Sequence, residues 1–322
     1  DVERSRGLGD VYKRQNQRSA PSVLSRSGVV LVDKPSGPTS HDMVAKLRRI
    51  MGTRRVGHSG TLDPMATGLL VVGVERGTKF LAHVVAHDKR YEATVRLGAA
   101  TQTDDAQGDV LSTAAPEDLR ALTEQQVREA FDTQRGDIMQ RPTSVSSIKI
   151  GGKRAHELVR EGQEVVLPER PVTIFSLEVL DVVVDAATSC IDARISVHCS
   201  SGTYIRAIAR DVGAALGVGG HLTKLRRTSV GPFDISEART LEQLDENPSL
   251  TLNLDQAMVR CFDTRDISES EGVDLSLGKW LEPVGNKGVR AAVTPSGQAI
   301  ALIEEKGKRA ASVFVARPAG MD

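Results

Sequence analysis

The stretch that most constrains the fold of this chain is the segment Gly57–Leu70. Its glycines at 57, 60 and 68 interrupt any helical or strand periodicity, so we expect an irregular loop that leads into the apolar, strand-like run Leu69–Val72. Pro64 fixes its own φ and favours an extended backbone at Asp63. The carboxylate then points outward instead of folding back as a cap. A rigid loop ahead of a buried strand is a common place for a reacting group, although an isolated Asp-Pro pair is more often a simple turn.

The whole segment carries more information than the Asp-Pro pair. It reads GHSGTLDPMATGLL and resembles the loop of the TruB-type tRNA pseudouridine synthases, roughly G-H-x-G-T-L-D-P-x-A-T-G-L-L, with Ser59 where Thr is commoner. The resemblance implies that Asp63 is the catalytic residue. It also places His58 in the space that a target base vacates in the tRNA T-loop, although His58 could equally be a core histidine that supports the loop.

Residues 28–42 resemble the opening motif of the same family. They read GVVLVDKPSGPTSHD, which predicts a short buried strand, a turn and a helix that starts with the capping box Thr39–Asp42. The resemblance implies that this motif braces the catalytic loop. It places Lys34 near the RNA or near the loop backbone, while a solvated strand end is the plainer alternative.

Two later segments complete the implied uridine pocket. Residues 89–98 alternate with the period of a half-buried strand and resemble the family's K-x-Y motif, in which Tyr91 lies against the target base. Residues 191–199 form a second alternating strand, followed by CSSGTYIR and an amphipathic helix. Arg206 lies in the first turn of that helix, where the dipole disfavours a cation, so an anionic partner is expected. The resemblance makes that partner Asp63 and places Tyr204 in the pocket lining.

Further substrate contacts are implied in two places. The run from His221 to Phe233 matches H-x-x-x-L-R-R-T followed by G-P-F, which implies that Leu225 packs by the base while Arg226 and Arg227 face RNA or brace the fold. Residues 140–149 correspond to a stretch that usually reads Q-x-P-P-x-Y-S-A-x-K. Lys149 is retained there as a substrate-binding candidate. The departures at Thr143, Val145 and Ser147 put substrate packing in doubt, but not the chemistry of Asp63.

The resemblance covers residues 28–235 and implies an α/β (α+β) pseudouridine-synthase fold with a mixed, largely antiparallel central sheet and flanking helices. We expect a catalytic domain over 28–250, with an insertion at about 99–140 that contains a helix at 116–131 and an acid near Asp105. A polar break at 241–248 precedes short strands, which predict a small C-terminal β domain, PUA-like by resemblance, over 251–322. Residues 1–27 lack periodicity, so we expect a disordered leader, part of which could be non-native.

Charge is informative only through its distribution. The 42 Lys and Arg balance 42 Asp and Glu, which alone argues weakly against a nucleic-acid partner. Two basic clusters argue for one, and they consist of Lys46, Arg48, Arg49, Arg54 and Arg55 and of Lys224, Arg226 and Arg227. Solvated helix surfaces would explain these clusters about equally well. The three cysteines lack metal-site spacing, and no apolar stretch reaches the ~18 residues of a membrane helix, so we expect a cytoplasmic protein.

The implied reaction is isomerisation of uridine-55 in the tRNA T-loop to pseudouridine, by a monomer that needs no cofactor or metal. Asp63 could add to C6 of the base or to C1′ of the ribose, or the 2′ proton could leave first. A paired-carboxylate glycosidase would need a second acid at defined spacing, which no other motif supplies. A guide-RNA-dependent pseudouridine synthase and a non-catalytic tRNA-folding protein of the same fold stay open as alternatives.

Overall fold

The computed structural model describes residues 22–146, 148–161, 163, 165–184 and 190–321. Most of the predicted leader therefore lies outside the described residues. The chain divides into two compact units, one formed by Val29–Thr251 and the other by Asp1–Gly28 together with Leu252–Asp322.

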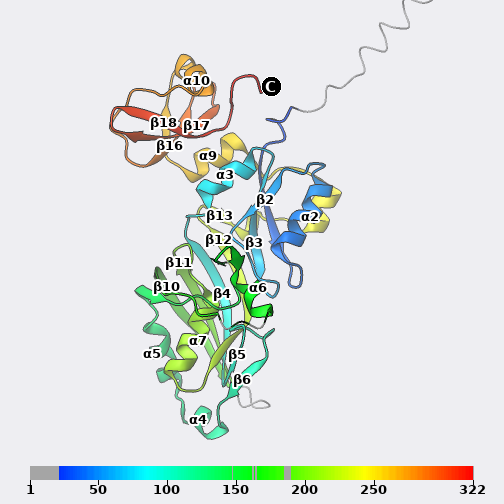
Figure 1. Ribbon diagram of the computed structural model, residues 1–322, viewed down its shortest axis with the longest axis vertical. Coiled ribbons are helices and arrows are strands. Elements are labelled where there is room, and N and C mark those ends of the chain that lie inside the picture. Colours follow the sequence, from blue (N-terminus) through cyan, green and yellow to red (C-terminus); the bar gives the residue numbers. More distant parts are fainter. Residues whose placement is uncertain (1–21, 147, 162, 164, 185–189, 322) are drawn as a thin grey trace, which may run out of the picture. The chain divides into compact units, whose positions relative to one another are not determined.

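A mixed sheet is the centre of the larger unit (Figure 1). Its strands lie in the order β1-β3-β12-β4-β11-β10-β7, with β2 paired to β3 and β13 to β12. Their bounds are β1 Gly28–Lys34, β2 Val56–Ser59, β3 Thr67–Val74, β4 Lys89–Leu97, β7 Gly136–Gln140, β10 Arg170–Val184, β11 Ile191–Cys199, β12 Gly220–Val230 and β13 Phe233–Asp234. The pairs from β12 through β4, β11 and β10 to β7 are antiparallel, whereas β12 and β3 are parallel. The predicted mixed, largely antiparallel sheet is confirmed.

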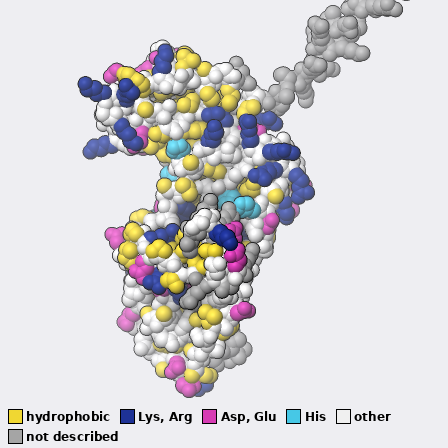
Figure 2. All heavy atoms as spheres, in the orientation of Figure 1, with side chains coloured by type: hydrophobic (Ala, Val, Ile, Leu, Met, Phe, Trp, Pro, Cys, Tyr) yellow, Lys and Arg dark blue, Asp and Glu magenta, His cyan; other side chains and the backbone are white. Residues whose placement is uncertain are grey.

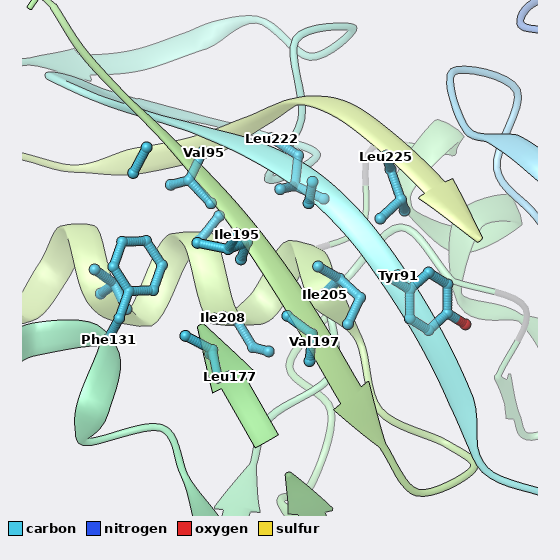
Figure 3. Packing of buried hydrophobic residues seen from close by; sticks show 14 of the residues in the cluster. Tyr91, Val95, Phe131, Leu177, Ile195, Val197, Ile205, Ile208, Leu222 and Leu225 are labelled. Carbon is cyan, nitrogen blue, oxygen red and sulfur yellow. The ribbon is translucent and has the colours of Figure 1, made fainter. Parts of the chain in front are cut away.

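Strict alternation along the central strands explains the main core. In β4 and β11 every second residue is buried, from Lys89 to Leu97 and from Ile191 to Cys199. Their apolar side chains pack against helix α7 (Ile205–Ala215) and helix α5 (Glu124–Asp132), as Figure 3 shows. A second core lies where helix α2 (Ser40–Ile50) and helix α8 (Leu241–Glu246) pack with β1 and β3. The predicted capping box of Thr39 and Asp42 starts α2.

Two local predictions were wrong. The helix expected over 116–131 is two helices, α4 (Pro116–Ala121) and α5, because Thr123 caps a new helix through Gln126. Residues 56–59 are not irregular, since β2 pairs with β3 in spite of Gly57. The segment 241–248, in which a polar break suggested a domain boundary, contains helix α8, whose leucines face the core.

The smaller unit contains the predicted small C-terminal β domain. Its sheet has the order β15-β16-β17-β18, and β16, β17 and β18 are antiparallel neighbours. The bounds are α9 Leu254–Cys261, β15 Thr264–Asp266, α10 Glu269–Ser276, β16 Val289–Val293, β17 Ala299–Lys306 and β18 Arg309–Val315. Apolar residues from α10 and from the strands β16, β17 and β18 form its core.

The remaining elements are short. They are α3 Gly77–Val84, β5 Ala99–Thr101, β6 Val110–Thr113, β8 Lys149–Ile150, β9 Lys153–Arg154, α6 Ala155–Arg160, a 3-10 turn at Ile235–Glu237 and β14 Leu252–Asn253. No helix among the described residues is long and apolar enough to cross a membrane.

Candidate active site

The loop that carries Asp63 connects β2 to β3, and buried side chains hold its backbone. Lys34, at the end of β1, is completely buried. Its Nζ donates to the carbonyls of Pro35 at 3.0 Å, Pro64 at 3.2 Å and Ala66 at 2.7 Å. Burial lowers the pKa of Lys34 to about 8. Of the two roles expected for Lys34, its contacts are those of a brace on the loop backbone.

Ser40 and Arg227 hold the same loop at two other points. Ser40 Oγ donates to the Leu62 carbonyl and accepts from the Leu62 N–H, both at 2.9 Å. Arg227, which is 1% exposed, donates to Gly60 O at 2.9 Å and to Leu69 O at 2.8 Å. A Cβ at Gly68 would lie 2.3 Å from the Arg227 carbonyl, so only glycine fits there. The sequence reasoning missed Ser40, although its position after the Thr39 cap was visible.

Asp63 and Arg206 form the ion pair that the sequence predicted. Arg206 Nε lies 2.9 Å from Asp63 Oδ2, and the arginine side chain is 4% exposed against 34% for the aspartate. The guanidinium has further partners in the Thr103 carbonyl at 2.7 Å, the Val145 carbonyl at 2.9 Å and Asp105 Oδ2 at 3.6 Å. Arg206 is thus held on several sides and aims one edge at Asp63.

The position where this chain departs from the family stretch is part of that arrangement. The Thr143 hydroxyl lies 3.5 Å from Arg206 Nη1, and Val145 contributes its carbonyl. The departures at 143 and 145 therefore bear on how Arg206 is held. Ser147 lies outside the described residues.

The pKa of the Asp63 carboxyl is raised, a direction that the sequence reasoning did not anticipate. Burial is the largest cause, and the charge of Asp105 adds to it, whereas Arg206 and Lys34 lower the pKa. The arginine acts in the expected sense, but desolvation of the charged form outweighs it. Asp63 is consequently a desolvated carboxyl whose charged form depends on Arg206.

Two cavities meet at Asp63 and Arg206. The first has a volume of about 470 Å³ and is lined by Asp63, Tyr91, Tyr204, Arg206, Leu225 and Arg227 among others. The predicted pocket residues from β4, α7 and β12 are thereby brought together. In Figure 3 the Tyr91 hydroxyl points away from Ile205 and Val197, and Leu225 extends from the neighbouring strand. Tyr91 is 7% exposed, and burial raises the pKa of its phenol.

His58 lies in the second cavity, of about 830 Å³. Its Nδ1 is buried and has no hydrogen-bond partner among the described residues, and its ring meets that of His41 edge-on at 5.6 Å. Burial lowers the pKa of His58 to about 4, so the ring is neutral at pH 7. A neutral ring with a polar atom that no described residue contacts, beside the Asp63 loop, suits contact with a polar ligand.

The remaining predicted residues have other surroundings. Arg226 pairs with Asp33 at 2.8 Å, is 40% exposed and does not line the first cavity or the second. Lys149 has its backbone in β8, while its side chain lies outside the described residues. Arg170, which no prediction named, lies over the Tyr204 ring with its Cζ 4.9 Å from the centroid.

One of the two basic clusters forms an exposed face. Its five members lie on α2 and the turn that follows, and Figure 2 shows Lys and Arg gathered there. They are Lys46, Arg48, Arg49, Arg54 and Arg55. Among the described residues, no group of three or more His, Cys, Asp and Glu is arranged to hold a metal ion.

Comparison with known families matches consecutive parts of the chain. Residues 48–205 match the TruB family pseudouridylate synthase (N terminal domain), 206–262 the tRNA pseudouridylate synthase B C-terminal domain, and 262–317 the tRNA pseudouridine synthase II C-terminal family.

Similar curated proteins include two named tRNA pseudouridine synthase B. That of Corynebacterium jeikeium (strain K411) is 92% identical, over 95% of this chain and 100% of that protein. That of Corynebacterium glutamicum (strain R) is 64% identical, over 91% of this chain and 97% of that protein.

Solved structures share the fold at low identity. An H/ACA RNP bound to a substrate RNA containing 2′-deoxyuridine has a TM-score of 0.68 at 22% identity, covering 93% of this chain and 87% of that chain. A Cbf5-Nop10-Gar1 complex has a TM-score of 0.69 at 24% identity, covering 92% and 87%.

Proposed function

The chain belongs to the TruB family of pseudouridine synthases, and we propose that Asp63 is the nucleophile with which it acts on tRNA. It is a tRNA pseudouridine synthase, an isomerase. The observation that carries the role of Asp63 is its 2.9 Å pair with Arg206 at the junction of two cavities. A carboxylate that reacts must be charged and aimed, and a buried guanidinium supports both conditions.

The reaction breaks the N1–C1′ bond of the uridine and forms a C5–C1′ bond. Asp63 adds to C6 or to C1′, or acts after loss of the 2′ proton. Tyr91 and Leu225 flank the base, and Arg206 keeps the nucleophile ionised. Burial raises the pKa of the Tyr91 phenol above its ordinary value, which makes the phenolate less accessible and favours stacking as the main role of Tyr91. To accept the C5 proton as well, the Tyr91 phenol must first transfer its own hydroxyl proton to another acceptor.

We further propose that the target is uridine-55, extruded from the T-loop into the first cavity. Extrusion of a base costs a few kcal/mol, which contacts at the vacated position can offset. His58 is neutral and lies in the adjoining cavity, which suits that position. Arg226, Lys149 and the exposed face of α2 contact the RNA in this proposal, while Lys34 and Arg227 act through the loop. The chain works as a cytoplasmic monomer.

The domain division is part of the proposal. Residues 28–250 form the catalytic domain, and 251–322 a PUA-like RNA-binding domain. Compact units at Val29–Thr251 and Leu252–Asp322, the latter grouped with the residues up to Gly28, support it.

The decisive test replaces Asp63 and compares it with another paired aspartate. Asp63→Ala should abolish pseudouridine formation on a T-loop transcript while the RNA still binds. Asp192→Ala is the matched control, because Asp192 pairs with Arg96 at 2.6 Å and neither residue lines either cavity, so the rate should stay unchanged. Pseudouridine is measured by chemical mapping and binding by filter retention. An active Asp63→Ala protein would refute the proposed nucleophile.

Two alternative activities are separated in the same assay. Activity without added RNA other than the tRNA substrate excludes a guide-RNA requirement. A protein that only refolds tRNA would bind the transcript and form no product. T-loop RNA with 5-fluorouridine at the target position should yield an enzyme–RNA adduct or a rearranged product, and neither should form with Asp63→Ala.

A further inference from the structure

Helix α7 begins without a capping side chain of its own. Its N-cap residue is Tyr204, which has an extended backbone at φ −104° and ψ 110° and makes no side-chain capping hydrogen bond. Helices commonly begin at Ser, Thr, Asp or Asn, whose side chains satisfy free N–H groups of the first turn. Arg206 lies only two residues after Tyr204. The start of this helix therefore needs another support, and it bears directly on the ion pair with Asp63.

Gln140 supplies that support from a different strand. Its Oε1 accepts from the Tyr204 N–H at 2.8 Å, and its Nε2 donates to the Tyr204 carbonyl at 3.1 Å. The side chain is 1% exposed. A primary amide is suited to this task, because it offers one acceptor and one donor to the two polar groups of a single residue.

The strand partner of Gln140 contacts the same turn. Gln140 and Arg170 are opposite each other in the antiparallel pair of β7 and β10. Arg170 donates to the Gly202 carbonyl and lies over the Tyr204 ring. One cross-strand pair thus restrains the backbone before α7, Gln140 from the buried side and Arg170 from the rim of the first cavity.

We propose, on the basis of the function proposed above, that Gln140 is a positioning residue which sets the position of Arg206 relative to Asp63. The contacts of the guanidinium with Thr103, Val145 and Asp105 hold its tip. Gln140 fixes the backbone at the start of α7, from which the Arg206 side chain extends. A displacement of a positioning group by about 1 Å can lower the rate ~100-fold. A contact that fixes the backbone of Arg206 can therefore affect turnover although Gln140 does not touch the substrate.

The test compares Gln140→Met with the wild-type protein on the same tRNA. Methionine has a similar length and fills the buried site, but it cannot bond the Tyr204 backbone. We expect kcat to fall about tenfold to 100-fold with KM changed less than about twofold, because the RNA-binding surfaces are intact. The groups facing Asp63 are Arg206 from α7, Asp105 from the turn after β5, and Lys34 from β1. Weakening the arginine contact should therefore move the acid limb of the kcat profile to higher pH.

Two further variants test whether a lower kcat of Gln140→Met reflects only impaired folding. Gln140→Glu retains the acceptor for the Tyr204 N–H and loses the donor, so its kcat should fall between wild type and Gln140→Met. Thr251→Val removes another side-chain acceptor of a backbone N–H, that of Leu31 at 3.0 Å, and neither residue lines a cavity. It should lower the melting temperature without moving the acid limb.

The proposal is overturned if Gln140→Met keeps the wild-type kcat, if the acid limb stays where it is, or if KM rises while kcat is unchanged. Failure of the proposed function itself would be distinguishable. In that case the wild-type and Asp63→Ala proteins would form pseudouridine at the same rate, or neither protein would form any.

Discussion

At the scale of single residues, Asp63 is subject to opposing influences. Arg206 lowers the pKa of its carboxyl, while burial and the nearby charge of Asp105 raise it by more. Asp105 also reaches Arg206 at 3.6 Å, so the two carboxylates share one guanidinium. The reactivity of Asp63 therefore depends on a neighbour that need not touch the substrate.

The expected consequence can be measured as a pH profile. Asp105→Asn removes a negative charge, so the pKa of Asp63 should fall and the acid limb of kcat should move to lower pH. The sign follows because the charged form of Asp63 is required and is disfavoured by a like charge nearby. Single-turnover rates measured from about pH 4 to about pH 8, where carboxyl groups with a raised pKa titrate, would show the shift. An acid limb that moves upward would contradict this account.

The sequence located the ion pair but not its surroundings. The resemblance named Asp63 and Arg206, and the unfavourable place of a cation in a first helical turn independently indicated an anionic partner. The direction of the Asp63 pKa could not be read in that way, because desolvation depends on side chains from several strands. Ser40 and Gln140 were missed for the same reason, since each acts on a backbone far away in sequence.

At the scale of elements, the segment 116–131 shows where a prediction from sequence fails. One helix was predicted over residues 116–131, within a polar region. However, Leu122 has an extended backbone, and Thr123 is the N-cap of a second helix, α5. The box formed by Thr123 and Gln126 was readable in the sequence, and it should have divided the segment. By contrast, the strict alternation in β4 and β11 predicted both strands correctly, because one face of each is buried against α7.

Loss of this cap should be measurable as stability. Thr123→Ala removes the hydroxyl that accepts from the Gln126 N–H, so the free energy of unfolding should fall by about 1 kcal/mol. Urea denaturation followed by circular dichroism would measure it. Gln125→Ala, on the exposed face of the same helix, is the control and should change stability by less than about 0.5 kcal/mol. Equal effects of the two variants would argue against a cap at Thr123.

At the scale of the whole molecule, a neutral total charge conceals an uneven surface. The positive charge of the exposed basic face on α2 is balanced by acidic residues in other parts of the chain. Composition alone left a solvated surface and an RNA contact about equally plausible, because it does not show where the cations lie on the folded protein. In the structure the five cations are exposed together.

Salt dependence distinguishes the two interpretations. The double variant Arg49→Gln and Arg54→Gln should weaken tRNA binding and reduce the slope of log K against log salt by about one for each phosphate that is no longer neutralised. The kcat at saturating tRNA should stay unchanged. Arg135→Gln, an exposed arginine in the turn after α5, should leave the slope as it is. A double variant with the wild-type slope would show that the face on α2 does not bind RNA.

The parallel contact between β3 and β12 has a consequence for biosynthesis. It joins Thr67 to Arg226 and Gly68 to Arg227, so one support of the Asp63 loop comes from a strand that is made much later than the supports Lys34 and Ser40. On a ribosome that adds roughly 5–20 residues per second, Asp63, the proposed nucleophile, is made several seconds before its partner Arg206. The nascent protein therefore cannot react with RNA until nearly the entire larger unit has been translated, which ties the onset of activity to the completion of folding.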